Sequence, residues 1–81
     1  KKYSVILFND DITPMEFVIE LLIGVFNHSQ QTAEEITMKV HADGKGIAGV
    51  YYYEIAEQKV AESIALSRGS GFSLALDLEE L

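Results

Sequence analysis

The sequence predicts a small α/β (α+β) sandwich in which three short strands pack against three helices in the order β-α-α-β-α-β. Apolar side chains recur with helical spacing in residues 14–27 and again in the stretch after residue 29, which predicts two successive helices. Residues 72–78 alternate between apolar side chains and polar or small ones, which is typical of a strand with one covered face. The helices are therefore expected on one face of the sheet. An antiparallel sheet is expected, although the residues alone do not prove it.

The first strand is predicted at residues 3–8, because residues 5–8 form a short apolar run of β-prone side chains. Three polar turn formers follow at residues 9–11, and their side chains can bond their own backbone and end a strand. A strand is therefore expected to pass into a helix at this point.

The start of that helix carries several cues that agree. Thr13 is predicted to be the N-cap, with Pro14 at the first helical position, where its missing N–H costs nothing. Glu16 completes a capping-box pattern, and Ile12 with Phe17 is predicted to form a hydrophobic staple. A rigid junction of this kind presents polar groups at the end of a fixed scaffold, which suits recognition.

Two helices are predicted to follow each other closely. The first spans residues 14–27, and its apolar stripe is Val18, Leu21, Leu22, Val25 and Phe26. The second begins at either Ser29 or Thr32, both of which can act as an N-cap. It ends at Gly44, a predicted left-handed cap. Its inward stripe is Ala33, Ile36 and Val40.

The second half of the chain predicts a strand, a helix and a strand. Residues 46–52 read as a strand with glycines where two backbones pass closely. A helix is predicted at residues 53–68, with inward residues Ala56, Val60, Ser63 and Ile64. Two glycines within residues 69–71 break it before the last strand at residues 72–78, whose inward residues are Phe72, Leu74, Leu76 and Leu78.

Composition limits the partners that the chain can have. A length of 81 residues predicts a single domain over residues 1–81. A net charge of −7 argues against nucleic acid or an anionic membrane surface as the main partner. The chain has no cysteine for a disulfide or a thiolate metal site, no membrane-length apolar run and no signal-peptide pattern. The sequence begins immediately before the predicted first strand, so we expect that any natural N-terminal extension is missing from it.

The sequence argues against an enzyme. His28 and His41 are the only histidines, no cysteine nucleophile is present, and no serine has a nucleophile-elbow context. Asp10 and Asp11 are adjacent and point apart in an extended turn, which makes them a poor acid/base pair. With His41 they offer three metal ligands at most, so no metal and no cofactor are expected. His28 is expected to be a solvent-facing loop residue.

A mixed polar and apolar cluster is expected near the first junction. Its polar members are Asn9, Asp10 and His41, and its apolar members are Met15, Val18 and Val40. From the residues alone, a surface or capping role is favoured over a ligand role for His41, and ordinary core is favoured over pocket lining for Met15 and Val18. The residues by themselves therefore indicate a binding module with a mixed pocket.

Four blocks of the sequence resemble the ClpS family, adaptors of the bacterial N-end rule pathway. Residues 9–18 read Asn-Asp-Asp-Ile-Thr-Pro-Met-Glu-Phe-Val, which resembles the family's signature. The further matches are Val40-His41 with Gly44-Lys45, Gly49-Val50-Tyr51, and Glu54-Ile55-Ala56-Glu57-Gln58-Lys59-Val60-Ala61, continuing to the strand around Leu74. The resemblance covers essentially the whole chain, and it implies three antiparallel strands packed against three helices.

The resemblance also implies a function. Family members bind the α-ammonium of a substrate's N-terminal residue, hold its bulky side chain (Phe, Leu, Tyr or Trp) in a pocket, and deliver the substrate to a ClpA- or ClpC-type AAA+ unfoldase for degradation by ClpP. Asn9 and His41 match the side-chain ligands of the ammonium, and Asp10 matches a position that contributes its backbone and local charge. Seven residues match the side-chain pocket: Leu7, Thr13, Met15, Val18, Thr37, Val40 and Leu74.

Two further positions of the resemblance carry expectations. Thr37 stands where the family usually has a methionine that gates the pocket, so a roomier and more polar wall with weaker exclusion of Ile and Val is predicted. Glu54 and Lys59 match positions that contact the N-terminal domain of the unfoldase, and Glu57 lies near them. Without the resemblance, these charges would read as an ordinary solvated helix face.

Alternative interpretations remain at this stage. A ClpS-like domain also binds substrates within N-end rule ubiquitin ligases, although so short a chain argues against one. The C-terminal domain of the ribosomal stalk protein has a similar fold and would need no ammonium pocket. A metal-dependent hydrolase is the least supported. The leading interpretation predicts a monomer in the bacterial cytoplasm, or in a plastid if the source is a photosynthetic eukaryote.

Overall fold

The computed structural model describes all 81 residues and has the predicted order of strands and helices. The six elements are β1 (Lys2–Phe8), α1 (Met15–Gly24), α2 (Gln30–Asp43), β2 (Lys45–Tyr52), α3 (Tyr53–Gly69) and β3 (Leu76–Glu80). The strand order is β2-β1-β3, and β1 is antiparallel to both neighbours. The antiparallel sheet implied by the family resemblance is therefore confirmed.

The apolar run near the start of the chain forms the central strand of the sheet. Residues 4–7 of β1 are all buried, because β1 is covered on both edges and its inward face packs on the helices. Val5 pairs with Gly49 of β2 and with Leu78 of β3. A bulge in the β1–β2 ladder lies between Val5 and Ile6, where Ala48 is the extra residue of β2 and its side chain is buried.

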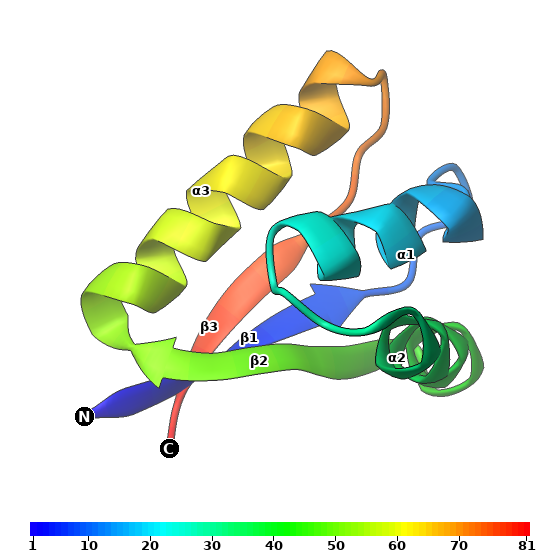
Figure 1. The fold of residues 1–81 in the computed structure, drawn as a ribbon. Helices are drawn as coiled ribbons and strands as arrows, with labels where there is room; N and C mark the ends of the chain where they lie inside the picture. Colours follow the sequence, from blue (N-terminus) through cyan, green and yellow to red (C-terminus); the bar gives the residue numbers. More distant parts are fainter.

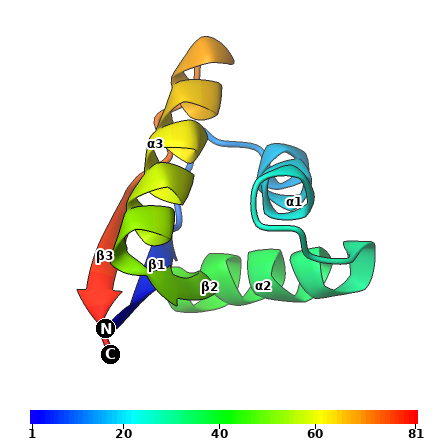
Figure 2. The same cartoon turned by 60° about the vertical axis from the view of Figure 1, so that its left-hand side comes forward.

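All three helices lie on one face of the sheet, as predicted. Figure 1 shows α3 running along the sheet while α1 and α2 pack against each other beside it, and Figure 2 shows α1 and α2 on the same side. One apolar core joins inward residues of β1 and β2, the three helices, the turn after α1 and the segment before β3: Val5, Leu7, Val18, Leu21, Leu22, Val25, Phe26, Ala33, Val40, Ala48, Ala56 and Leu74. Every buried side-chain polar atom has a hydrogen-bond partner.

The start of α1 differs from the prediction. Pro14 is the N-cap, with no side-chain capping bond, and the helix begins at Met15. The Thr13 hydroxyl instead donates to Asp10, so the predicted capping box is wrong. The staple is wrong as well, because the Ile12 side chain is 67% exposed and cannot pack on the helix. A turn closed by the Asp10 carboxylate has replaced the local capping motif.

The other boundaries shift for identifiable reasons. Helix α1 ends at Gly24 instead of residue 27, because the chain turns there and reaches a positive φ of 59° at Asn27. Ser29 is the N-cap of α2 and accepts the Thr32 N–H at 3.1 Å, which decides between the two predicted starts. The predicted left-handed cap at Gly44 is confirmed by its φ of 87°.

The last strand begins later than residue 72. The Leu74 N–H donates to the Ser67 hydroxyl of α3 instead of joining the sheet ladder, and β3 starts at Leu76. The predicted alternation survives in the burial of the side chains, since Leu74 is buried and its neighbours Ser73 and Ala75 are exposed. An alternating pattern reports side-chain burial, and a ladder additionally needs paired backbone groups.

His28 is not the solvent-facing residue that the sequence predicts. Its ring is half-buried, and Nε2 donates to the carbonyl of Ala48 at the bulge of β2. Since a carbonyl can only accept, Nε2 carries the proton. The loop between α1 and α2 is thereby fastened to the sheet.

Candidate functional site

A cavity opens where β1 ends, between the start of α1 and the last turns of α2. The empty space within it, open solvent at its mouth included, is about 270 Å³. The residues that line it are Phe8, Asn9, Asp10, Thr13, Met15, Val18, Thr37, Val40, His41 and Leu74. Nine of the ten residues predicted for the ammonium site and side-chain pocket are in this set. The fold therefore brings together residues that are up to 65 positions apart, from Asn9 to Leu74.

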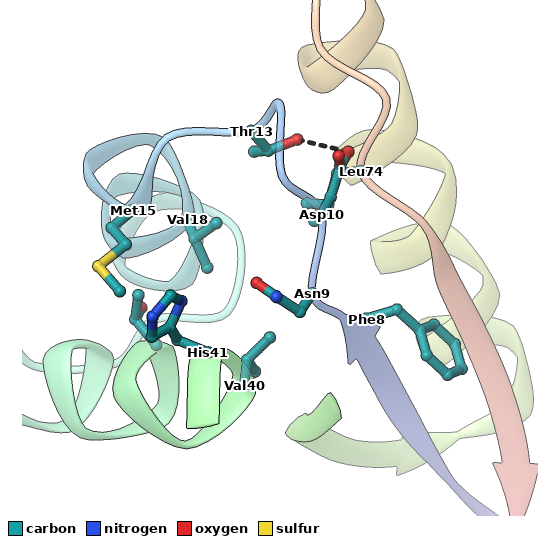
Figure 3. A pocket seen from close by; sticks show the side chains of 10 residues that line it. Phe8, Asn9, Asp10, Thr13, Met15, Val18, Val40, His41 and Leu74 are labelled. Carbon is teal, nitrogen blue, oxygen red and sulfur yellow. Dashed lines mark hydrogen bonds between the residues drawn. The ribbon is translucent and has the colours of Figure 1, made fainter. Parts of the chain in front are cut away.

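Leu7 is the exception among the predicted pocket residues. It is fully buried in the core beneath the site and does not line the cavity. Phe8 is found instead, but its ring points away from the other labelled residues, so its backbone forms the wall (Figure 3). Alternation along β1 explains this, because successive side chains leave a strand on opposite faces.

The cavity has a polar rim and an apolar interior. Asn9 and His41 are exposed at the rim, and the Asn9 amide points into the space between α1 and α2 (Figure 3). Inside, Val18, Val40 and Leu74 are each at most 7% exposed. Met15 is 38% exposed and lies on α1 opposite His41, so a flexible apolar side chain stands at the mouth.

Asp10 organises the loop that forms one wall. Its Oδ1 accepts the Ile12 N–H at 2.9 Å, and its Oδ2 accepts the hydroxyls of Thr13 and Ser73, each at 2.9 Å. The Ile12 N–H, together with the two hydroxyls, lowers the pKa of the Asp10 carboxyl below its ordinary value. These bonds are present while Asp10 is charged and are lost only when the pH falls through that lowered pKa.

Ser73 was missed by the sequence reasoning. It stands 63 positions from Asp10, and nothing in the pattern around it separates it from the other outward-facing positions of residues 72–78. The contact exists because the segment after α3 runs beside the loop after β1. Only a pairing between distant segments creates it.

Thr37 contributes a less polar wall than the sequence suggested. The residue is only 3% exposed, and its hydroxyl donates to the Ala33 carbonyl one turn earlier, at 2.7 Å. The hydroxyl hydrogen is therefore used within α2. What Thr37 offers a ligand is mainly its small size.

The three residues predicted to contact an unfoldase lie on α3, and none of them lines the cavity. Glu54 and Glu57 are exposed, and Glu57 accepts the hydroxyl of Tyr53 at 3.0 Å. Lys59 is only partly exposed, because its ammonium donates to the Val25 carbonyl at 2.7 Å, just past the end of α1. A cation there complements the free carbonyls of the helix end. Lys59 thus also fastens α3 to α1.

No group of three or more His, Asp or Glu side chains converges in a way that could hold a metal ion. No helix has both the length and the apolar character needed to cross a membrane.

Comparison with known proteins decides the family. Residues 1–77 match the family model described as "ATP-dependent Clp protease adaptor protein ClpS". The chain belongs to the ClpS family. ClpS proteins are adaptors and not enzymes, as the family's name states.

Relatives named "ATP-dependent Clp protease adapter protein ClpS" match over the whole chain. The one from Clostridium acetobutylicum is 52% identical over 81 residues, which are all of this chain and 80% of that protein. The one from Helicobacter hepaticus is 42% identical over 81 residues, again all of this chain and 82% of that protein. These names favour a ClpS adaptor over the ubiquitin-ligase and stalk-protein interpretations.

A solved ClpS structure has the same fold. The structure of Agrobacterium tumefaciens ClpS2 bound to L-phenylalaninamide superposes with a TM-score of 0.93. It is 39% identical in sequence, and the match covers 98% of this chain and 95% of that one. The fold predicted from sequence is thus that of a ClpS protein.

Proposed function

We propose that this chain is an N-degron adaptor that binds proteins through a free N-terminal residue with a bulky apolar side chain and delivers them to a ClpA- or ClpC-type unfoldase for degradation by ClpP. The observation that carries the proposal is the cavity at the end of β1, with polar groups at its rim and apolar side chains inside. The preferred N-terminal residues are Phe, Leu, Tyr and Trp. The matched relatives come from bacteria, which supports action in a bacterial cell.

The rim suits an ammonium group. An ammonium has three donors and no acceptor, so its capture needs converging acceptors. The amide oxygen of Asn9, a neutral ring nitrogen of His41 and a backbone carbonyl of the loop supply them. The Asp10 carboxylate is engaged by three donors, so we assign it an indirect part through its negative charge and the loop shape that it holds.

The interior suits a large apolar side chain. Burying a Phe or Leu side chain among Val18, Val40 and Leu74 is worth roughly 1.5–3 kcal/mol before ordering costs. The solved ClpS2 is bound to L-phenylalaninamide, which joins a free amine to a benzyl side chain. Its amine suits the polar rim of the cavity, and its benzyl group suits the apolar interior.

A titration with two peptides tests the proposal. A Phe-starting peptide with a free amine is expected to bind, and the same peptide acetylated at its N-terminus is expected to bind much more weakly, because acetylation removes the charge and two of the three donors. Isothermal calorimetry measures both affinities. Equal binding of the two peptides would refute an ammonium site and would favour an interaction surface without a pocket.

Thr37 is expected to set selectivity by leaving room for β-branched residues. In Thr37→Met, the longer side chain fills the space beside Val40, so peptides starting with Ile or Val should lose about tenfold in affinity while a Phe-starting peptide changes less than threefold. Competition binding with Phe, Leu, Ile and Val peptides measures the ranking. Thr32→Met, in the first turn of the same helix and outside the cavity lining, is the matched control. An unchanged ranking would show that Thr37 does not control selectivity.

Delivery is assigned to the outer surface of α3. Glu54→Lys is expected to weaken binding of an isolated unfoldase N-terminal domain by about tenfold, because it reverses an exposed charge within the contact. Glu62→Lys makes the same change two turns further along α3 and is the control. Lys59 is a poor test position, since its bond to Val25 also supports the fold. Equal weakening by both variants would indicate a general charge effect and would contradict the assignment.

A further inference from the structure

The segment between α3 and β3 contacts α1, the loop after β1 and the cavity through three consecutive residues. The ring of Phe72 packs edge-to-face on that of Phe17 in α1, with centroids 5.0 Å apart. Leu74 forms part of the wall itself and is 7% exposed. Between them, the Ser73 hydroxyl donates to the Asp10 carboxylate. These contacts occupy residues 72–74, where no sheet ladder has yet formed.

The Ser73 bond does what the other two bonds to Asp10 do not. The Ile12 N–H and the Thr13 hydroxyl come from two and three positions along the chain, so they shape the turn without placing it relative to the rest of the molecule. The Ser73 bond spans 63 positions and joins that turn to the opposite wall. A second long-range bond anchors the start of the turn, where the Asn9 N–H donates to the Gly44 carbonyl at 2.8 Å.

We propose that Ser73 is a positioning residue for the cavity: by holding the Asp10 carboxylate, it fixes the distance between the loop that carries Asn9 and the wall formed by Leu74. This inference rests on the proposed function and adds to it a residue outside the family signature quoted above. Ser73 itself does not line the cavity. It acts on a bound peptide only through Asp10.

The first test is binding at pH 7 of a Phe-starting peptide with a free amine. Ser73→Ala is expected to weaken binding by about three- to tenfold, the cost of losing one hydrogen bond to a charged group at a partly exposed position. Ser73→Thr keeps the hydroxyl and should bind within about twofold of wild type. Ser70→Ala removes an exposed serine hydroxyl from the loop after α3 and is the matched control.

The second test separates positioning from a general loss of structure. In a ¹³C NMR titration of the side-chain carboxyl of Asp10, Ser73→Ala should move the midpoint upward, because a donor that favours the charged form is gone. Ser73→Thr should leave the midpoint where it is in wild type. Three other ionisable groups surround this contact, namely Asp11 beside Asp10, His41 in the same cavity, and Arg68 of α3, which lines a hollow with Ser73. Because the ¹³C signal belongs to the Asp10 carboxyl alone, its titration midpoint is measured separately from those three groups.

The outcomes are distinct. Weaker peptide binding together with a raised Asp10 midpoint in Ser73→Ala, both restored in Ser73→Thr, supports the proposal. Wild-type affinity in Ser73→Ala, or an Asp10 midpoint that does not move, overturns it. If the wild-type chain bound neither free nor acetylated peptide, the proposed function would fail, and the Asp10 titration would still decide whether Ser73 holds the carboxylate.

Discussion

Replacing Asn9 with alanine is expected to lower the affinity for a free Phe-starting peptide by about 10- to 100-fold. The variant removes an acceptor at the rim of the cavity, and a hydrogen bond to a charged group is worth about 1.5–3 kcal/mol. The fold should survive, because Asn9 is exposed and the bond from its N–H to the Gly44 carbonyl involves only the backbone. Thermal unfolding of the variant checks this, and calorimetric titration gives the affinity.

The acetylated peptide is the control for this variant. Since acetylation already removes the ammonium, Asn9→Ala should cost little further affinity with the acetylated peptide. A large loss with both peptides would mean that Asn9 acts on the peptide backbone or on the loop. Unchanged binding of the free peptide would rule Asn9 out as a ligand of the ammonium.

Binding is expected to weaken by up to about tenfold for each unit that the pH falls between 7 and 5. An imidazole takes up a proton over this range. A protonated His41 has no acceptor nitrogen, and it places a positive charge beside the positive ammonium, so affinity is highest when the ring is neutral. Asp10 does not produce this loss, because its lowered pKa keeps it charged throughout the range. Fluorescence anisotropy with a labelled Phe-starting peptide measures the profile.

Variants of the two histidines identify which residue causes the pH dependence of peptide binding. His41→Gln should flatten it, since glutamine does not titrate. His28→Gln should leave it in place, because His28 lies outside the cavity and donates to the Ala48 carbonyl. A wild-type affinity that stays flat to about pH 5, or a slope that persists in His41→Gln, would remove His41 from the ammonium site.

Periodicity predicted most of the fold because buried positions are occupied by apolar residues at the spacing of a helix or a strand. The stripe from Val18 to Phe26 and the alternation at residues 72–78 each reported which side chains face the core, and the structure agrees. Element ends were less predictable, since they depend on which of several polar groups takes each free backbone N–H or carbonyl. The Thr13 hydroxyl, which was predicted to cap α1, donates to the Asp10 carboxylate instead. The Leu74 N–H, which was predicted to pair within the sheet, donates to the Ser67 hydroxyl.

The sequence by itself determined the order of elements, the one-sided sheet, the family and nine of the residues that line the cavity, because each of these follows from local pattern or from a conspicuous motif. Only the tertiary structure decided which groups are already engaged. It showed the Asp10 carboxylate held by Ser73, the Thr37 hydroxyl turned to its own helix, Lys59 bonded past the end of α1, and Leu7 in the core. For Ser73 and Lys59 the physical reason is that a hydrogen bond between distant segments depends on their relative position in space, which no periodic pattern in the sequence records.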